Sequence, residues 1–296
     1  MSTPDTSKSS IRIKVDLTNP GQFFACCGLL ELAGRVEPGA SGYFENGCFV
    51  MQADVDRLLA KFFDSDIEVI KCASSKARGR DDCEVEDEDD ETVVDPNRGR
   101  IYPMRLPKPF DLLLDWWNDE EAQEQKLKTW TAGQRVTDLL INHHKKHKRS
   151  GETHFARIPS MREHFARAVR EYPHDWIRAA LPIEAPMAFS YDSRLSRNNA
   201  LDLGHTDAGV LAFSPAVDVL VLIALQRFRP RMLTQWSRNV FCTWREPLPV
   251  EIASVAALGM IPHLITDCYE FPIKRRDSQG RFKLFGHAQR TRRPYV

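Results

Sequence analysis

The chain opens with apolar and charged residues in alternation. Over Ile11–Leu17 every second residue is apolar, which is the period of a half-buried strand. We expect a helix to begin directly afterwards, because Asn19 can cap its N-terminus and Pro20 stands where its missing N–H costs nothing. Gln22 follows three residues after the cap, as in a capping box. The opening pattern therefore predicts a strand that runs straight into a helix.

The predicted helix is apolar on nearly all sides. Almost every residue of Phe23–Ala33 is apolar or small, which indicates a buried helix, and Gly34 is expected to end it. A β-hairpin that turns at Asn46-Gly47 and a short helix over Asp54–Phe63 should follow. These elements predict a strand–helix–hairpin unit built around a buried central helix.

The periodic pattern is lost between residues 73 and 100. Nine of the eleven residues of Asp81–Glu91 are acidic, and such a block repels itself and buries little apolar surface. We therefore predict a disordered insertion near residues 73–100. Apolar sequence resumes at Ile101, where several prolines favour an extended segment that leads into a short helix near Trp117.

Helical signals dominate the second half of the chain. The pattern predicts helices over Gly133–Lys148, from Ser160 with Glu163 completing a capping box, and from Ser214 through an apolar run to Leu225. A β-hairpin is predicted near the C-terminus, between residues 268 and 285. The expected fold class is α+β, with the N-terminal unit followed by a mixed, helix-rich half that ends in a β-hairpin.

Charge divides the chain, although its net charge is zero. Residues 1–125 carry 14 basic and 26 acidic side chains, a net charge of −12, and residues 126–296 carry 27 and 15, a net charge of +12. We predict a disordered leader at residues 1–10, an acidic domain at 11–125 and a basic region at 126–296. The basic region suits a polyanionic partner.

The sequence also bears on the cellular compartment in which the protein is expected. No apolar run reaches the roughly 18 residues needed to cross a bilayer, and the polar N-terminus has no signal core, so a cytoplasmic protein without membrane contact is expected. The seven cysteines form no Cys-x-x-Cys pair and are odd in number, which favours reduced thiols.

The densest basic cluster of the sequence is His143–Arg149. On the predicted helix, His143 and His147 would be four residues apart and could share a metal ion, but the adjacent lysines repel a cation. No metal or other cofactor is therefore expected. Phosphate contact is the stronger interpretation, with the candidates Lys145, Lys146, Lys148 and Arg149.

The polar stretch Tyr191–Asp207 lies between two apolar segments and permits two interpretations. Arginine and asparagine can contact phosphates and base edges, which makes a recognition loop of Arg194, Arg197, Asn198 and Asn199. A hydrolytic or metal site would instead use Asp202, His205 and Asp207, although these residue types also form turns and caps.

Two further groups complete the candidate nucleic-acid contacts. Trp130 is a candidate for base stacking, and Gln134 and Arg135 follow it closely. The C-terminal hairpin adds the basic residues Lys274, Arg275 and Arg276.

The strand Ile11–Leu17 running into Asn19–Ala33, followed much later by Tyr191-Asp192-Ser193-Arg194, resembles the small large-subunit-like protein of type I-G (formerly I-U) CRISPR systems. The resemblance implies a non-catalytic subunit of the Cascade surveillance complex. Such a subunit binds CRISPR RNA and other Cascade subunits, helps to inspect target double-stranded DNA for the short flanking motif (PAM), and signals to a separate helicase-nuclease effector.

Three classes of function remain open at this point. The first is nucleic-acid recognition within a Cascade complex. The second is a metal-dependent nuclease or hydrolase that uses Asp202, His205 and Asp207. The third is a purely structural subunit whose opposite charges serve contacts with other proteins.

Overall fold

The computed structural model describes residues 10–70, 102–130, 136–149, 152–182, 189–194, 212–233, 238–275 and 283–291. Three predicted features fall largely or wholly outside these ranges. They are the leader, of which residue 10 alone is described, the acidic insertion near 73–100, and the loop beyond residue 194.

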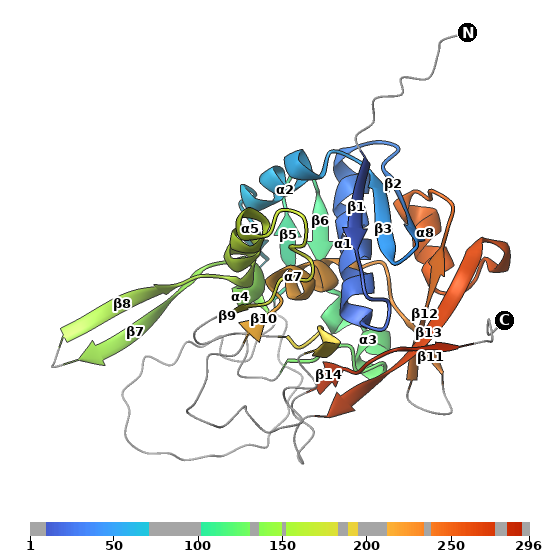
Figure 1. Cartoon of the computed structure of the whole chain (residues 1–296). Coiled ribbons are helices and arrows are strands. Elements are labelled where there is room, and N and C mark those ends of the chain that lie inside the picture. Colours follow the sequence, from blue (N-terminus) through green and yellow to red (C-terminus); the bar gives the residue numbers. More distant parts are fainter. Residues whose placement is uncertain are drawn as a thin grey trace, which may run out of the picture.

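The N-terminal half forms the predicted strand–helix–hairpin unit and continues into a second small sheet (Figure 1). Its elements are β1 (Ser10–Lys14), α1 (Pro20–Val36), β2 (Ser41–Glu45), β3 (Cys48–Gln52), α2 (Val55–Phe63), β4 (Glu68–Val69), β5 (Met104–Leu106), β6 (Leu112–Leu114), the 3-10 turn η1 (Trp116–Asn118) and α3 (Glu120–Glu124). The antiparallel strand orders are β1-β3-β2 and β4-β5-β6.

In the described part of the C-terminal half, helices are mixed with three antiparallel sheets. Its elements are α4 (Thr137–Leu140), β7 (His143–Arg149), β8 (Glu152–Ile158), α5 (Met161–Glu171), β9 (Leu181–Pro182), β10 (Ala212–Phe213), α7 (Pro215–Ala224), β11 (Arg231–Leu233), β12 (Arg238–Trp244), α8 (Val250–Ala257), η3 (Pro262–Leu264), β13 (Ile265–Arg275), β14 (Lys283–Phe285) and β15 (Gln289–Thr291). The sheets are β7-β8, β9-β10, and β11-β12-β13-β14 with β15 also on β13. The α+β class is therefore confirmed.

Helix α1 begins where the sequence predicts. The side-chain oxygen of Asn19 accepts the backbone N–H of Gly21 at 3.1 Å, and Pro20 occupies the first turn. The expected capping box differs in one contact, because the side-chain oxygen of Gln22 accepts the backbone N–H of Asp16 at 2.8 Å and not that of the cap. Gln22 thus closes the turn between β1 and the helix. The helix also continues past Gly34 to Val36.

Helix α1 is buried on all sides from Pro20 to Ala33. Its close approach to α7 depends on Gly28, where an added Cβ would lie 2.0 Å from the backbone oxygen of Leu220. Figure 1 shows the two helices together at the centre of the molecule. One contiguous apolar core includes residues on both sides of position 125, so the predicted boundary separates regions of opposite charge that share this core.

Aromatic rings attach the C-terminal sheet to the same helix. Phe23 stacks on Phe241 of β12, with ring centroids 4.1 Å apart, and Phe24 meets Phe271 of β13 edge-on at 6.1 Å. The indole N–H of Trp244 donates to the backbone oxygen of Gly42 at 2.7 Å, which ties the end of β12 to β2. The helix is therefore enclosed by elements from both halves.

Two predicted segments differ from the structure. The sequence predicts one helix over residues 133–148, but α4 has only four residues and β7 follows it. The predicted helix rests on an apolar stripe, and this stripe stops at Leu140. The polar residues that follow pair with β8. The segment after Ile101 contains a β5–β6 hairpin in addition to a short helix near Trp117, which is the 3-10 helix η1.

The substitution Gly28→Ala tests the contact between α1 and α7. The new methyl group would collide with backbone, so we expect a loss of unfolding free energy of about 3 kcal/mol, although alanine is intrinsically the better helix former. Gly34→Ala in the same helix is the control, because its nearest neighbour is a methyl group of Val250, which can move. Urea unfolding checks both variants. Equal losses would contradict the tight crossing at Gly28.

Candidate nucleic-acid interface

Strands β7 and β8 form a two-stranded ribbon that extends from the body of the protein (Figure 1). They pair antiparallel over seven positions, from His143 opposite Ile158 to Arg149 opposite Glu152. At about 3.3 Å per residue, the paired strands are about 20 Å long. The backbones of Lys145, Lys146 and Lys148 lie along this ribbon.

The strand conformation changes what the two histidines can do. Residues four apart on a strand are separated by about 13 Å, whereas on a helix they are neighbours. His143 and His147 therefore cannot hold one metal ion together on β7. Among the residues described, no group of three or more potential metal ligands gathers in one place.

Polar contacts hold the base of the ribbon to the body. The imidazole Nδ1 of His143 lies 3.6 Å from a carboxylate oxygen of the buried Asp138. The side-chain oxygen of Asn142 accepts the backbone N–H of Ser160 at 2.7 Å, and Ser160 in turn caps α5. The ribbon thus leaves the core at a fixed point.

The start of the Tyr191 loop is built into the core. Tyr191, Asp192 and Ser193 are fully buried. The side-chain amide of Asn19 donates to the Asp192 carboxylate at 2.7 Å, and the Asn19 oxygen accepts the backbone N–H of Ser193 at 3.2 Å. An added Cβ on Gly21 would lie 2.3 Å from the backbone oxygen of Tyr191. The start of α1 therefore contacts the Tyr191-Asp192-Ser193 segment directly.

Arg194 uses its guanidinium within this network. Its Nη2 atom donates to Asp192 at 2.6 Å and to the Ser214 hydroxyl at 3.2 Å, and its Nη1 atom donates to the backbone oxygen of Arg178 at 2.9 Å. Burial acts to raise the pKa of Asp192, but the contacts with Arg194 and Ser214 outweigh it and lower that pKa. Arg194 thus neutralises a buried carboxylate, with about a third of its own side chain exposed.

A second buried carboxylate belongs to Asp218 of α7. It accepts the backbone N–H groups of Phe189 at 3.1 Å and Tyr191 at 3.3 Å. Burial raises its pKa from 3.8 to about 7, and the two N–H donors act in the opposite direction. A single aspartate in an otherwise apolar helix was the sequence signal for this group, and our sequence predictions did not include it.

The remaining candidate contacts are scattered. Lys274 is exposed near the end of β13, and the backbone of Arg275 lies opposite Lys283 of β14. Trp130 is 3% exposed and packs against Trp116, Trp117 and Phe189, so it is not available for base stacking. Outside the described residues lie Gln134, Arg135, Arg197, Asn198, Asn199, Arg276, Asp202, His205 and Asp207.

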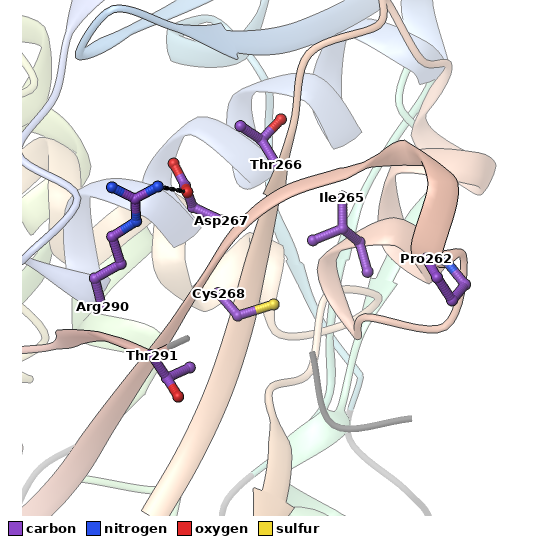
Figure 2. Close-up of a pocket in the computed structure, with 7 residues that line it drawn as sticks. All are labelled: Pro262, Ile265, Thr266, Asp267, Cys268, Arg290 and Thr291. Carbon is purple, nitrogen blue, oxygen red and sulfur yellow. Dashed lines mark hydrogen bonds and ion pairs between the residues drawn. The ribbon is translucent and has the colours of Figure 1, made fainter. Parts of the chain in front are cut away.

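A groove of about 720 Å³ lies beside β13 and β15. Figure 2 shows the Arg290 guanidinium joined to the Asp267 carboxylate on one side, with Cys268, Ile265 and Pro262 on the other. The opposite charges of Asp267 and Arg290 already neutralise each other. Among the lining residues that the structure describes, no other side chain is charged, so they offer no uncompensated charge to a nucleic acid.

The cysteines differ in part from the expected reduced thiols. Cys242 and Cys268 stand opposite each other on β12 and β13, with Cα atoms 4.1 Å apart, and form a disulfide bond. Only the register of the two strands reveals this pairing. Cys26 and Cys27 are free and buried in α1, where burial raises the pKa of both thiols.

No protein-family model, curated protein or solved structure matches this chain. Within the described ranges, no helix has the length and apolar character that crossing a bilayer requires.

The substitution Arg194→Ala tests whether this arginine supports the fold. Removing it leaves the Asp192 charge buried without its cation, so we expect a loss of about 2 to 4 kcal/mol of unfolding free energy, allowing for partial exposure of the pair. Arg178→Ala is the control, since its side chain takes part in an exposed pair with Asp175 and should change stability by under about 0.5 kcal/mol. Small, equal losses in denaturant unfolding would contradict the structural role.

The substitution Asp218→Asn tests the buried carboxylate through pH. Because its pKa is raised on folding, the native protein keeps a proton that the unfolded chain releases as the pH rises above about 4. Asp218 therefore destabilises the native state increasingly up to about pH 7, with a slope of at most about 1.4 kcal/mol per pH unit. Asparagine cannot ionise, so urea unfolding between about pH 5 and about pH 8 should show a weaker decline in the variant. Parallel pH profiles would refute this assignment.

Proposed function

We propose that this protein is a non-catalytic subunit of a type I CRISPR surveillance complex that contacts CRISPR RNA or target DNA and contributes to PAM recognition. The proposal joins the sequence resemblance to one structural observation. That observation is the β7–β8 ribbon, which carries the densest basic cluster of the chain away from the body (Figure 1).

The form of the ribbon suits a nucleic acid. The major groove of B-form DNA is about 12 Å wide and admits a two-stranded β-ribbon. Strand β7 contains four lysines and arginines and three histidines, whereas β8 contains one glutamate, one arginine and one histidine. A phosphate backbone attracts such a ribbon whatever its sequence, because lysine contacts phosphate as a point charge.

One binding residue that the sequence suggests has a different role in this proposal. Arg194 led the predicted recognition loop, but its guanidinium donates to Asp192, Ser214 and Arg178. General attraction to nucleic acid is therefore assigned to the ribbon lysines. Sequence preference is assigned to Arg197, Asn198 and Asn199, which follow the anchored segment in the chain.

Within a complex, this subunit would add a basic arm to an RNA-guided assembly. The remaining Cascade subunits and CRISPR RNA would supply pairing with the target strand, and a separate helicase-nuclease would cut. The shared core that encloses α1 would connect the arm to the body that faces the other subunits.

The variant Lys145→Gln/Lys146→Gln/Lys148→Gln tests the proposal. The logarithm of affinity for duplex DNA should fall linearly with the logarithm of salt concentration. The triple variant should reduce the steepness by up to about 2.7, because each phosphate that a lysine neutralises contributes about 0.9 to the slope. Fluorescence anisotropy across a salt series measures the slope, both for the purified chain and for the complex assembled with CRISPR RNA.

The control replaces three basic residues of the N-terminal half, in Lys14→Gln/Arg57→Gln/Lys61→Gln. Each of them is at least partly exposed on β1 or α2. An equal effect of the two triple variants, or none from either, would exclude the ribbon as the contact. Metal-dependent cleavage of nucleic acid that His205→Ala abolishes would favour the hydrolase instead. Assembly into the complex without nucleic-acid contact would favour a structural subunit.

A further inference from the structure

The disulfide bond lies on the face of the β12–β13 pair that points away from α1. Phe241 and Phe271 face that helix, and side chains alternate between the two faces along a strand. Cys242 and Cys268 therefore project to the opposite face, where they form a small apolar cluster with Val240. This cluster is separate from the main core. The bond is thus a feature of the outer side of the sheet.

The two sulfur atoms have different surroundings. Gly259, which follows α8, packs so closely on Cys242 that an added Cβ would lie 3.2 Å from the Cys242 Sγ atom. Cys268 instead lines the groove of about 720 Å³ beside β13 and β15 (Figure 2). Both side chains are largely buried, so the groove decides from which side a small molecule reaches the bond. It opens on Cys268.

The groove also lies in the direction from which the bond can be broken. A thiolate cleaves a disulfide by attacking one sulfur in line with the bond, from the side opposite the sulfur that leaves. Cys242 stands on β12, on one side of β13, and Thr291 of β15 stands opposite Cys268 on the other side. An in-line approach to Cys268 therefore comes over β15, where Thr291 and Cys268 both line the groove.

We propose that Cys268 is a site of reversible thiol–disulfide exchange with a small thiol of the glutathione class. The thiolate sulfur bonds to the Cys268 Sγ atom as the bond to Cys242 breaks, and the electron pair leaves on the Cys242 sulfur, which takes up a proton. The product is a mixed disulfide at Cys268 and a thiol at Cys242. Attack by the Cys242 thiolate on Cys268 restores the bond and releases the small thiol, so no other oxidant or reductant takes part.

The fold is arranged to persist while the bond is open. Strands β12 and β13 stay paired through their backbones from Arg238 opposite Pro272 to Trp244 opposite Ile265. The aromatic contacts that attach the other face of the pair to α1 do not involve either cysteine. Exchange would therefore change the outer face of the sheet and place the small thiol in the groove. The inference does not depend on the proposed function.

The unaltered protein, purified without reductant, provides the first test. Free thiols are blocked with N-ethylmaleimide, reduced glutathione is added without denaturant, and the reaction is stopped with acid. Peptide mapping by mass spectrometry should then find glutathione on Cys268 in several-fold excess over Cys242. Equal modification of the two cysteines, an excess on Cys242, or exchange only in denaturant would overturn the inference. So would blocking of both cysteines before glutathione is added, since no bond would then exist.

The substitution Thr291→Phe tests the route of approach. A phenyl ring at this position would cover the in-line path to Cys268, so glutathione should add several-fold more slowly than in the unaltered protein. The control is Gln289→Phe, which places the same ring two residues earlier on β15, opposite Glu270 and outside the groove lining. It should leave the rate unchanged. Urea unfolding verifies that both variants are folded, and equal rates in the two folded variants would exclude the groove as the route.

Discussion

The structure depends on how the N-terminus of a fully buried helix, α1, obtains hydrogen-bond partners for its backbone N–H groups. The first N–H groups of a helix have no partner within it, and α1 begins in the core. Asn19 resolves this by accepting the N–H of Gly21, but its own amide then needs a buried acceptor. Asp192 supplies that acceptor, and its charge requires Arg194 and Ser214. One capping residue thus leads to a polar network that joins the two halves of the chain.

Sequence signals that span only a few residues, such as helix caps and turn residues, predicted where several helices begin and where one hairpin turns. Asn19, Ser160 and Ser214 precede helices where the sequence places them, and Asn46-Gly47 turns the hairpin with both residues at positive φ. The sequence did not predict the ribbon, because a run of histidines, lysines and arginines carries no apolar period, and its strands are defined by their pairing. Composition alone could not separate a basic helix end from a basic strand.

The sequence showed which residues of the candidate site carry charge, but not what each of these residues does. The cluster at Lys145, Lys146 and Lys148 was visible in the sequence, whereas the function of Arg194 depends on contacts over long sequence separations. The bond between Asn19 and Asp192 spans 173 positions.

The β7–β8 ribbon also bears on whether copies of the protein would associate through their strands. A two-stranded ribbon has two open edges, and open edges offer hydrogen-bonding groups to any strand that approaches. Lysines along an edge strand oppose such pairing, because a second copy brings the same charge. Binding a polyanion would neutralise that repulsion. The basic residues would then keep free subunits apart in solution and permit closer packing of protein once nucleic acid is bound.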